Sequence, residues 1–210
     1  MSDYRDKIEK ELIPKIEDIP NIIILELGVQ KGISTNYFLK ICDNNNGKLY
    51  SIDIDDCSNV SSSKRWKFIH SRDDDFNKIF NLIPNQIDVI YIDSLHEADH
   101  VEKLIYNYYV KLKKGGYIFI DDISHLLYLK NKSRSSFYCE INNKETFDKI
   151  LEIYNNNTDL IDLNFSFKSS GLGVIKKISN LPLKKTETII SRKFSLKNIV
   201  RLIWKKMKKN

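Results

Sequence analysis

Acidic or hydroxyl side chains lie at the carboxyl ends of five short apolar segments that we expect to be strands. They are Glu26, Asp53, Ser71–Asp73, Asp93 and Asp121–Asp122. Apolar segments without polar alternation are typical of parallel strands that are buried on both faces of a sheet. Because ligands of such sheets bind at the carboxyl ends of the strands, the sequence predicts one binding site built from these side chains.

The first of these segments continues into a glycine-rich turn, GVQKGIST over residues 28–35. Gly28 and Gly32 allow a tight turn and a close approach of the backbone to a ligand, and the amides that open the next helix point at the same place. The carboxylate of Asp53 can accept hydrogen bonds from both hydroxyls of a ribose. These features favour a nucleoside ligand, although the GxxxG spacing fits a dinucleotide less well than GxGxxG. The alternative is an ordinary turn with a solvent-facing Asp53.

Three carboxylates, those of Asp93, Asp121 and Asp122, follow two neighbouring predicted strands. The ends of neighbouring strands lie about 5 Å apart, so these acids repel one another unless a cation joins them. Ligands that are all oxygen favour a hard ion such as Mg²⁺, which would orient a substrate diol and lower the pKa of its hydroxyl. The alternative is that one or two of the acids only cap turns or helices.

Residues 96–100, HEADH, match the HExxH signature of zinc hydrolases. In that interpretation His96 and His100 bind zinc and Glu97 is the base. The segment directly follows a predicted buried strand and has no third ligand at the usual spacing, which argues against it. The simplest alternative is that His96 only hydrogen-bonds its loop and that His100 is exposed.

The length of 210 residues and a hydrophobic content of 41% indicate a globular protein with one main domain. We expect this domain over residues 1–178, a linker over 179–190 and a basic tail over 191–210. The three cysteines lack CxxC spacing and are odd in number, which is typical of free thiols in a reducing cytoplasm. No apolar stretch resembles a signal peptide or a membrane span, so we expect a cytoplasmic protein.

The net charge of +6 comes from the tail, because eight basic and no acidic residues lie in 191–210. The remainder is mildly acidic, so nucleic acid is not an expected partner. Apolar tail residues recur at helical spacing with Lys and Arg between them, which favours an amphipathic helix that lies on an anionic membrane surface. A partner protein, self-association, RNA contact or packing on the domain are the alternatives, and the oligomeric state stays open.

Hydrophobic periodicity and glycine or proline breaks predict alternating helices and strands. The predicted strands are Ile22–Leu27, Lys48–Ile54, Lys67–His70, Ile87–Ile92 and Tyr117–Ile120, followed by a hairpin of Leu160–Lys168 and Gly173–Lys177. The predicted helices are Asp3–Ile19, Thr35–Cys42, Asp75–Leu82, Glu97–Leu112 and Lys144–Tyr154, with a loop over Ser124–Asn143 that includes His125. Gly115 and Gly116 are expected to stop the helix Glu97–Leu112.

Four segments together resemble a class I S-adenosylmethionine-dependent methyltransferase: ELGVQKGIST at 26–35, SIDID at 51–55, IDVIYIDSLH at 87–96 and LKKGGYIFIDDI at 112–123. The resemblance covers about residues 20–177. It is to the small-molecule O-methyltransferase branch that includes macrocin-type sugar methyltransferases and the cephalosporin-hydroxylase-like family. It implies an α/β Rossmann-like fold with a mostly parallel seven-stranded sheet, helices on both faces and a terminal antiparallel hairpin.

The resemblance also implies roles for individual residues. The cofactor S-adenosylmethionine would be held by Glu26, Gly28, Gly32 and Ser34 at its methionine end, by Asp53 at its ribose, and by Ser71 and Asp73 near its adenine. Mg²⁺ would be held by Asp93, Asp121 and Asp122. Leu95 stands where the family often has a second acid, which leaves His96, beside Asp93, as the nearest catalytic base.

The leading hypothesis is an O-methyltransferase that acts on a hydroxyl of a sugar, a glycan precursor or another small molecule. The sugar rests on the resemblance and on the membrane-like tail, which would suit the assembly of cell-surface glycans. A zinc metallohydrolase that uses residues 96–100 is the second hypothesis. The third is a non-catalytic, membrane-associated binding protein with a methyltransferase-like fold.

Overall fold

The computed structural model describes residues 2–124, 137–185, 187–188 and 195–207. Most of the predicted loop after the fifth strand, with His125, lies outside the described residues. The described strands are β1 (Ile23–Leu27), β2 (Lys48–Asp53), β3 (Trp66–His70), β4 (Ile87–Ile92), β5 (Leu112–Asp121), β6 (Ile161–Ser166) and β7 (Leu172–Lys177). The described α-helices are α1 (Ser2–Lys7), α2 (Ile33–Asn44), α3 (Phe76–Ile79), α4 (Ala98–Tyr109), α5 (Phe137–Asn156) and α6 (Leu196–Met207).

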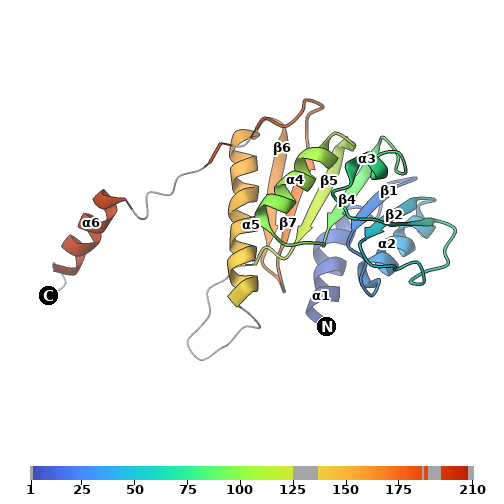
Figure 1. Cartoon of the computed structure of the whole chain (residues 1–210), viewed down its shortest axis with the longest axis horizontal. Helices are drawn as coiled ribbons and strands as arrows, with labels where there is room; N and C mark the ends of the chain where they lie inside the picture. The colour runs from blue at the N-terminus through green and yellow to red at the C-terminus, as the bar shows by residue number, and fades with distance from the viewer. Residues whose placement is uncertain (1, 125–136, 186, 189–194, 208–210) are drawn as a thin grey trace.

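All seven strands form one sheet in the order β3-β2-β1-β4-β5-β7-β6 (Figure 1). The first five strands are parallel, and β7 runs antiparallel to both β5 and β6. The strand order reverses between β1 and β4, which is where open α/β sheets bind ligands. The predicted mostly parallel sheet with a terminal antiparallel hairpin is confirmed.

Helices cover both faces of the sheet, because alternate strand residues point to opposite sides. Ile90 and Ile92 of β4 belong to a core cluster with α4 and α5. Val89 and Tyr91 belong to a second cluster with α2 and the N-terminal segment. Every residue of β4 is buried, and each large apolar side chain buried in this way contributes about 1.5–3 kcal/mol. Because both faces of β4 are buried, its sequence does not alternate between apolar and polar residues.

Several element boundaries differ from the prediction. Gly115 and Gly116 do not stop a helix but lie inside β5, where the register against β4 shifts between Ile87 and Val89. A Cβ at Gly116 would lie 2.7 Å from the Asp88 carbonyl oxygen, so the strands approach closely there. Helix α3 is shorter than predicted, and α5 is longer because it includes part of the predicted loop.

The N-terminal segment is helical as predicted, but it is divided into three short pieces. After α1 comes a π-helical turn, η1 (Ile8–Leu12), and then a 3₁₀ turn, η2 (Ile13–Lys15). Proline within a helical sequence removes a backbone donor, which accounts for the break at Pro14. Ile8, Leu12 and Ile16 are buried, so this segment is anchored to the domain.

Helix α6 confirms that the tail is helical over its described residues. Its seven large apolar side chains are exposed: Leu196, Ile199, Val200, Leu202, Ile203, Trp204 and Met207. Before it, part of the predicted linker packs on the domain, since Leu183 contacts the core and the Lys184 amide donates to Asn157 Oδ1 at 2.7 Å. Among the described helices, none is long and apolar enough to cross a membrane.

Gly28 follows β1 at the point where the strand order reverses. We expect Gly28→Ala to lower the free energy of unfolding by about 2–4 kcal/mol, since overpacking adds to the cost of a positive φ. The new Cβ would lie 2.1 Å from the Asp93 carbonyl oxygen, and φ is +97°. The measurement is urea denaturation.

Gly115→Ala is the matched control for this prediction. Gly115 has a similar φ of +88°, but its Cβ would meet nothing within 4 Å. This variant should therefore lose only about 1–2 kcal/mol, the cost of the positive φ alone. Equal losses in the two variants would contradict the steric explanation.

Candidate active site at the carboxyl ends of the strands

Glu26 is completely buried, and its carboxylate ties the first two strands to α2. Its Oε1 accepts a hydrogen bond from Ser34 Oγ at 2.6 Å, and its Oε2 accepts from Thr35 Oγ1 at 2.9 Å and Ser51 Oγ at 2.6 Å. Burial raises the pKa of Glu26 to about 7, although the three hydroxyls oppose the shift. Contact of Glu26 and Ser34 with a ligand, as the resemblance implies, would require these bonds to open. In this structure the bond between Glu26 and Ser34 joins the two ends of the glycine turn.

Asp53 holds the glycine turn in place at the end of β2. Its Oδ2 accepts from the backbone amides of Val29 at 2.7 Å and Gln30 at 3.0 Å, and its Oδ1 accepts from that of Asp55 at 2.9 Å. Burial acts to raise the pKa of Asp53, but the backbone N–H groups outweigh it and hold that pKa below its ordinary value. The carboxylate is therefore charged, half-buried and adjacent to the turn, as a ribose acceptor needs to be.

The two glycines of the turn are required by neighbouring protein atoms. Gly28 leaves room for the backbone of Asp93 at the end of β4, and Gly32, with φ of +71°, leaves room for the Val60 side chain. The sequence predicted that the close approach would be to a ligand. The structure shows that at Gly28 it is to β4, which brings the turn against the residues that follow that strand.

Ser71 and Asp73 follow β3 and face the beginning of α4. The Asp73 carboxylate accepts from Ser94 Oγ at 2.5 Å and lies 3.1 Å from His100 Nε2. The expectation that His100 is exposed is wrong, because its side chain is only 10% exposed and is bonded to Asp73. The Ser71 amide donates to the Asp53 carbonyl at 2.9 Å, which joins this segment to the end of β2. The role of both residues near an adenine stays a prediction.

Asp121, at the end of β5, is paired with a lysine from the N-terminal helix. Lys7 Nζ donates to Asp121 Oδ1, and both side chains are 1% exposed. Lys7 Nζ also donates to Ser170 Oγ at 2.7 Å and to the Gly171 carbonyl at 3.4 Å. The other carboxylate oxygen of Asp121 accepts from Tyr91 at 2.7 Å. Asp121 is thus satisfied by groups of this chain.

Two phenols contact Asp93, and 23% of its side chain stays exposed. The Tyr4 hydroxyl donates to Asp93 Oδ2 at 2.8 Å, and the Tyr91 hydroxyl lies 3.2 Å from the same oxygen. Burial raises the pKa of both tyrosines, and the charges of Asp93 and Asp121 raise it further. The phenols therefore stay protonated and act as donors to the carboxylates.

His96 lies between the two remaining acids. Its Nε2 is 3.4 Å from Asp93 Oδ1 and 3.5 Å from Asp122 Oδ2. Burial acts to lower the pKa of His96, but the hydrogen bond to Asp93 and the charge of Asp122 outweigh it and raise the pKa. Asp122 has a positive φ of 56°, a conformation that is uncommon outside glycine and that is often found at functional sites.

The three predicted metal ligands do not form an open carboxylate cluster. Asp121 is bonded to Lys7, Asp93 to Tyr4, and Asp122 faces His96. In the described part of the chain, no group of three or more His, Cys, Asp or Glu side chains is arranged to hold a metal ion. The residues as they stand do not fit a divalent cation held by all three acids.

The zinc-hydrolase interpretation is also wrong in geometry. His96 precedes α4, which begins at Ala98, so the two histidines of HEADH are not on one helical face. His96 faces Asp93 and Asp122, whereas His100 contacts Asp73.

Sequence reasoning missed Tyr4, Lys7 and Tyr91 as members of the site. Tyr91 lies in a strand that is apolar except for Asp88, and the other two lie in a helical segment far away in the chain. Lys7 gives no local signal, since it lies away from the helical face of Ile8, Leu12 and Ile16.

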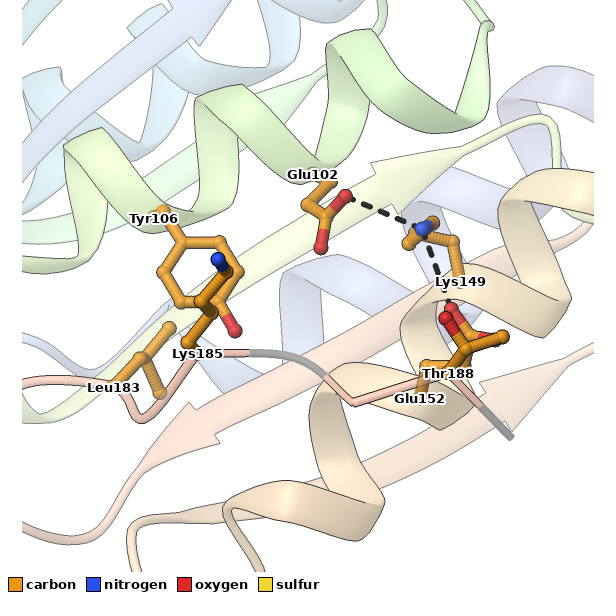
Figure 2. A pocket seen from close by; sticks show the side chains of 7 residues that line it. All are labelled: Glu102, Tyr106, Lys149, Glu152, Leu183, Lys185 and Thr188. Carbon is orange, nitrogen blue, oxygen red and sulfur yellow. Dashed lines mark ion pairs between the residues drawn. The ribbon is translucent and has the colours of Figure 1, made fainter. Parts of the chain in front are cut away.

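A separate hollow lies between α4, α5 and the segment that follows β7 (Figure 2). It has a volume of about 480 Å³ and is lined by Glu102, Tyr106, Lys149, Glu152, Leu183, Lys185 and Thr188. Lys149 pairs there with Glu102 at 3.2 Å and Glu152 at 3.3 Å. None of the predicted site residues lines this hollow, so we assign no chemistry to it.

The part of the chain that holds these residues matches a known family. Residues 25–123, just under half of the chain, match a protein family described as a methyltransferase domain. A comparison with curated proteins finds no match.

Solved structures with the same fold share little sequence with this chain. MycE methyltransferase from the mycinamycin biosynthetic pathway, solved with Mg and S-adenosylhomocysteine, is 16% identical with a TM-score of 0.62. The match covers 82% of this chain and 50% of MycE, so this chain spans half the length of that protein. A Staphylococcus aureus protein provisionally named as a caffeoyl-CoA O-methyltransferase is 19% identical, with a TM-score of 0.60 and 81% of each chain covered.

A third solved structure, the S-adenosylhomocysteine-bound methyltransferase PaMTH1 of Podospora anserina, is 14% identical with a TM-score of 0.59. The match covers 74% of this chain and 71% of the PaMTH1 chain. At these identities the likeness is one of fold. Residues 25–123 therefore match a methyltransferase-domain family, and the fold of the chain is similar to that of solved methyltransferases that bind S-adenosylhomocysteine.

Proposed function

We propose that this protein transfers the methyl group of S-adenosylmethionine to a hydroxyl group of a small molecule. The observation that carries the proposal is the contact between the glycine turn and the end of β4. It places the Asp53-bound turn directly beside Asp93, with His96 three residues further on. In this proposal the cofactor site and the base lie together where the strand order reverses.

Asp53 is the residue best suited to hold the cofactor's ribose. Its carboxylate is charged and half-buried, and a ribose hydroxyl can add to its remaining acceptor capacity. When bound, S-adenosylmethionine supplies an electrophilic methyl group on a sulfonium. The buried and charged residues of this chain then orient the acceptor and take its proton.

His96 is the proposed base. Methylation of a hydroxyl forms an O–C bond, breaks an S–C bond and releases a proton that must be accepted. In the neutral tautomer that donates from Nε2 to Asp93 or Asp122, Nδ1 is the free acceptor. The imidazolium that results is stabilised by the same two acids. Magnesium is not part of this proposal, because each of the three acids already faces a donor of the chain.

A sugar or glycan precursor is the proposed class of acceptor. This rests on the sequence resemblance and on α6, whose exposed apolar side chains would hold the enzyme at a membrane surface where such precursors are assembled. Lys197, Arg201 and Lys205 recur at i, i+4 spacing along one side of α6, apart from the apolar stripe. Each basic side chain near an anionic surface adds about 1 kcal/mol to binding.

Binding of S-adenosylhomocysteine tests the cofactor site. We expect the full chain to bind it in calorimetry, and Asp53→Ala to weaken binding at least about tenfold, because a charged acceptor and the support of the turn are both lost. Asp56→Ala is the control, since that exposed carboxylate bonds only within its own loop. No binding by the unmodified chain would refute the proposed function.

Transfer of a labelled methyl group to a panel of sugars, glycolipid precursors and phenols tests the reaction. His96→Ala should lower the rate about 100-fold, as expected for loss of a general base, with S-adenosylhomocysteine affinity unchanged. An alkali-stable ether product identifies a hydroxyl acceptor. Cofactor binding without transfer to any acceptor would favour a non-catalytic binding protein instead.

Co-sedimentation with anionic liposomes tests the tail. The apolar stripe of α6 is made by Leu196, Ile199, Val200, Ile203, Trp204 and Met207. Ile203→Asp should abolish binding, because Ile203 lies in the centre of this stripe. Leu202→Asp is the matched control, since Leu202 lies outside this stripe, and it should keep most of the binding. A chain without residues 191–210 that still binds as well as the full chain would end the membrane proposal.

A further inference from the structure

We propose that the Lys7 ammonium is the resident cation of the acid site and excludes a divalent metal from it. Lys7 would then be a positioning residue that acts through Asp121 and Tyr91 on Asp93. The role of Lys7 in catalysis rests on the proposed function. Its position in the acid site is independent of that function.

The surroundings of the Lys7 ammonium are those of a bound cation. Its Nζ donates to three oxygens from two other parts of the chain: Asp121 Oδ1, Ser170 Oγ and the Gly171 carbonyl. The Tyr4 ring lies under it, with 4.9 Å from Nζ to the ring centroid. An ammonium has three donors, and this site offers three oxygen acceptors.

Charge compensation explains why the lysine is buried here. An ionised carboxylate that is removed from water costs several kcal/mol unless a counter-charge is in contact with it. The buried carboxylate of Asp121 faces a second acid, Asp93, through the Tyr91 hydroxyl, which contacts both. A positive charge at this position reduces the repulsion between the two acids. In many metal sites a divalent ion supplies that charge, and here Lys7 does.

The fold holds the lysine firmly in this position. Lys7 is the last residue of α1, and the π-helical turn that follows it buries Ile8 and Leu12 against the domain. Single π-helical turns are rare in proteins overall, but those that occur are often found at functional sites. Ser170 lies in the turn between β6 and β7, and its hydroxyl also donates to Asp121 Oδ1 at 3.1 Å. The lysine is thus clamped between two elements that are far apart in the sequence.

The test is a titration of the full chain with Mn²⁺ alone. Electron paramagnetic resonance measures the ion that stays free and therefore the ion that is bound. The unmodified protein should bind no Mn²⁺ at the acid site up to about 1 mM. Lys7→Met keeps the length of the side chain and removes its charge, so it should bind Mn²⁺ at least about tenfold more tightly. Lys7→Arg should exclude the metal as the unmodified protein does.

Lys10→Met is the matched control, because Lys10 lies in the same N-terminal segment but is exposed and paired only with Asp6. It should leave Mn²⁺ binding as it is in the unmodified protein. Addition of Asp121→Asn to Lys7→Met should remove the gained binding.

Stoichiometric Mn²⁺ binding by the unmodified protein that Asp121→Asn abolishes would overturn the proposal. A folded Lys7→Met protein without increased affinity would overturn it too. If Lys7→Met does not fold, the measurements on the unmodified and Asp121→Asn proteins decide. S-adenosylhomocysteine binding, measured on the same samples, separates failure of this inference from failure of the proposed function.

Discussion

The structure depends on the need to compensate carboxylates that a parallel sheet brings to one edge. Asp53, Asp93 and Asp121 all lie at the carboxyl ends of strands, and Glu26 lies one residue before such an end. Each carboxylate has donors of a different kind. Backbone amides donate to Asp53, a phenol to Asp93, an ammonium to Asp121, and three hydroxyls to Glu26. An unpaired buried charge costs far more than a paired one, so these donors decide which acids can meet a ligand.

This compensation divides the edge into two halves with different properties. On the side of β1 and β2, the backbone of the turn uses part of the Asp53 carboxylate and leaves it half-exposed, which suits a neutral hydroxyl ligand. On the side of β4 and β5, a phenol and an ammonium cover Asp121, whereas the side chains of Asp93, His96 and Asp122 stay 23%, 23% and 31% exposed. His96 lies between the two partly exposed acids, and Asp121 is the acid that is closed off from solvent.

Much of the fold could be predicted because its signals are local. The nearly apolar β4, whose one charged residue is Asp88, and the hydrophobic stripe of α4 identify buried elements without any knowledge of their partners. Gly115 and Gly116 misled the prediction, since glycine pairs mark both helix ends and irregular strands, and only the approach of Asp88 from the next strand distinguishes the two. The site was predicted as a set of acids, but their donors were not.

The sequence by itself determined which acids end the strands, that a glycine turn follows β1, and that the tail is a basic amphipathic helix, because periodicity and residue type are local properties. Only the tertiary structure decided what each acid contacts. Lys7 and Asp121 are separated by 114 residues, and their meeting depends on how the N-terminal segment packs across the sheet. Hydrogen bonds and ion pairs are set by distance in space, which no local pattern records.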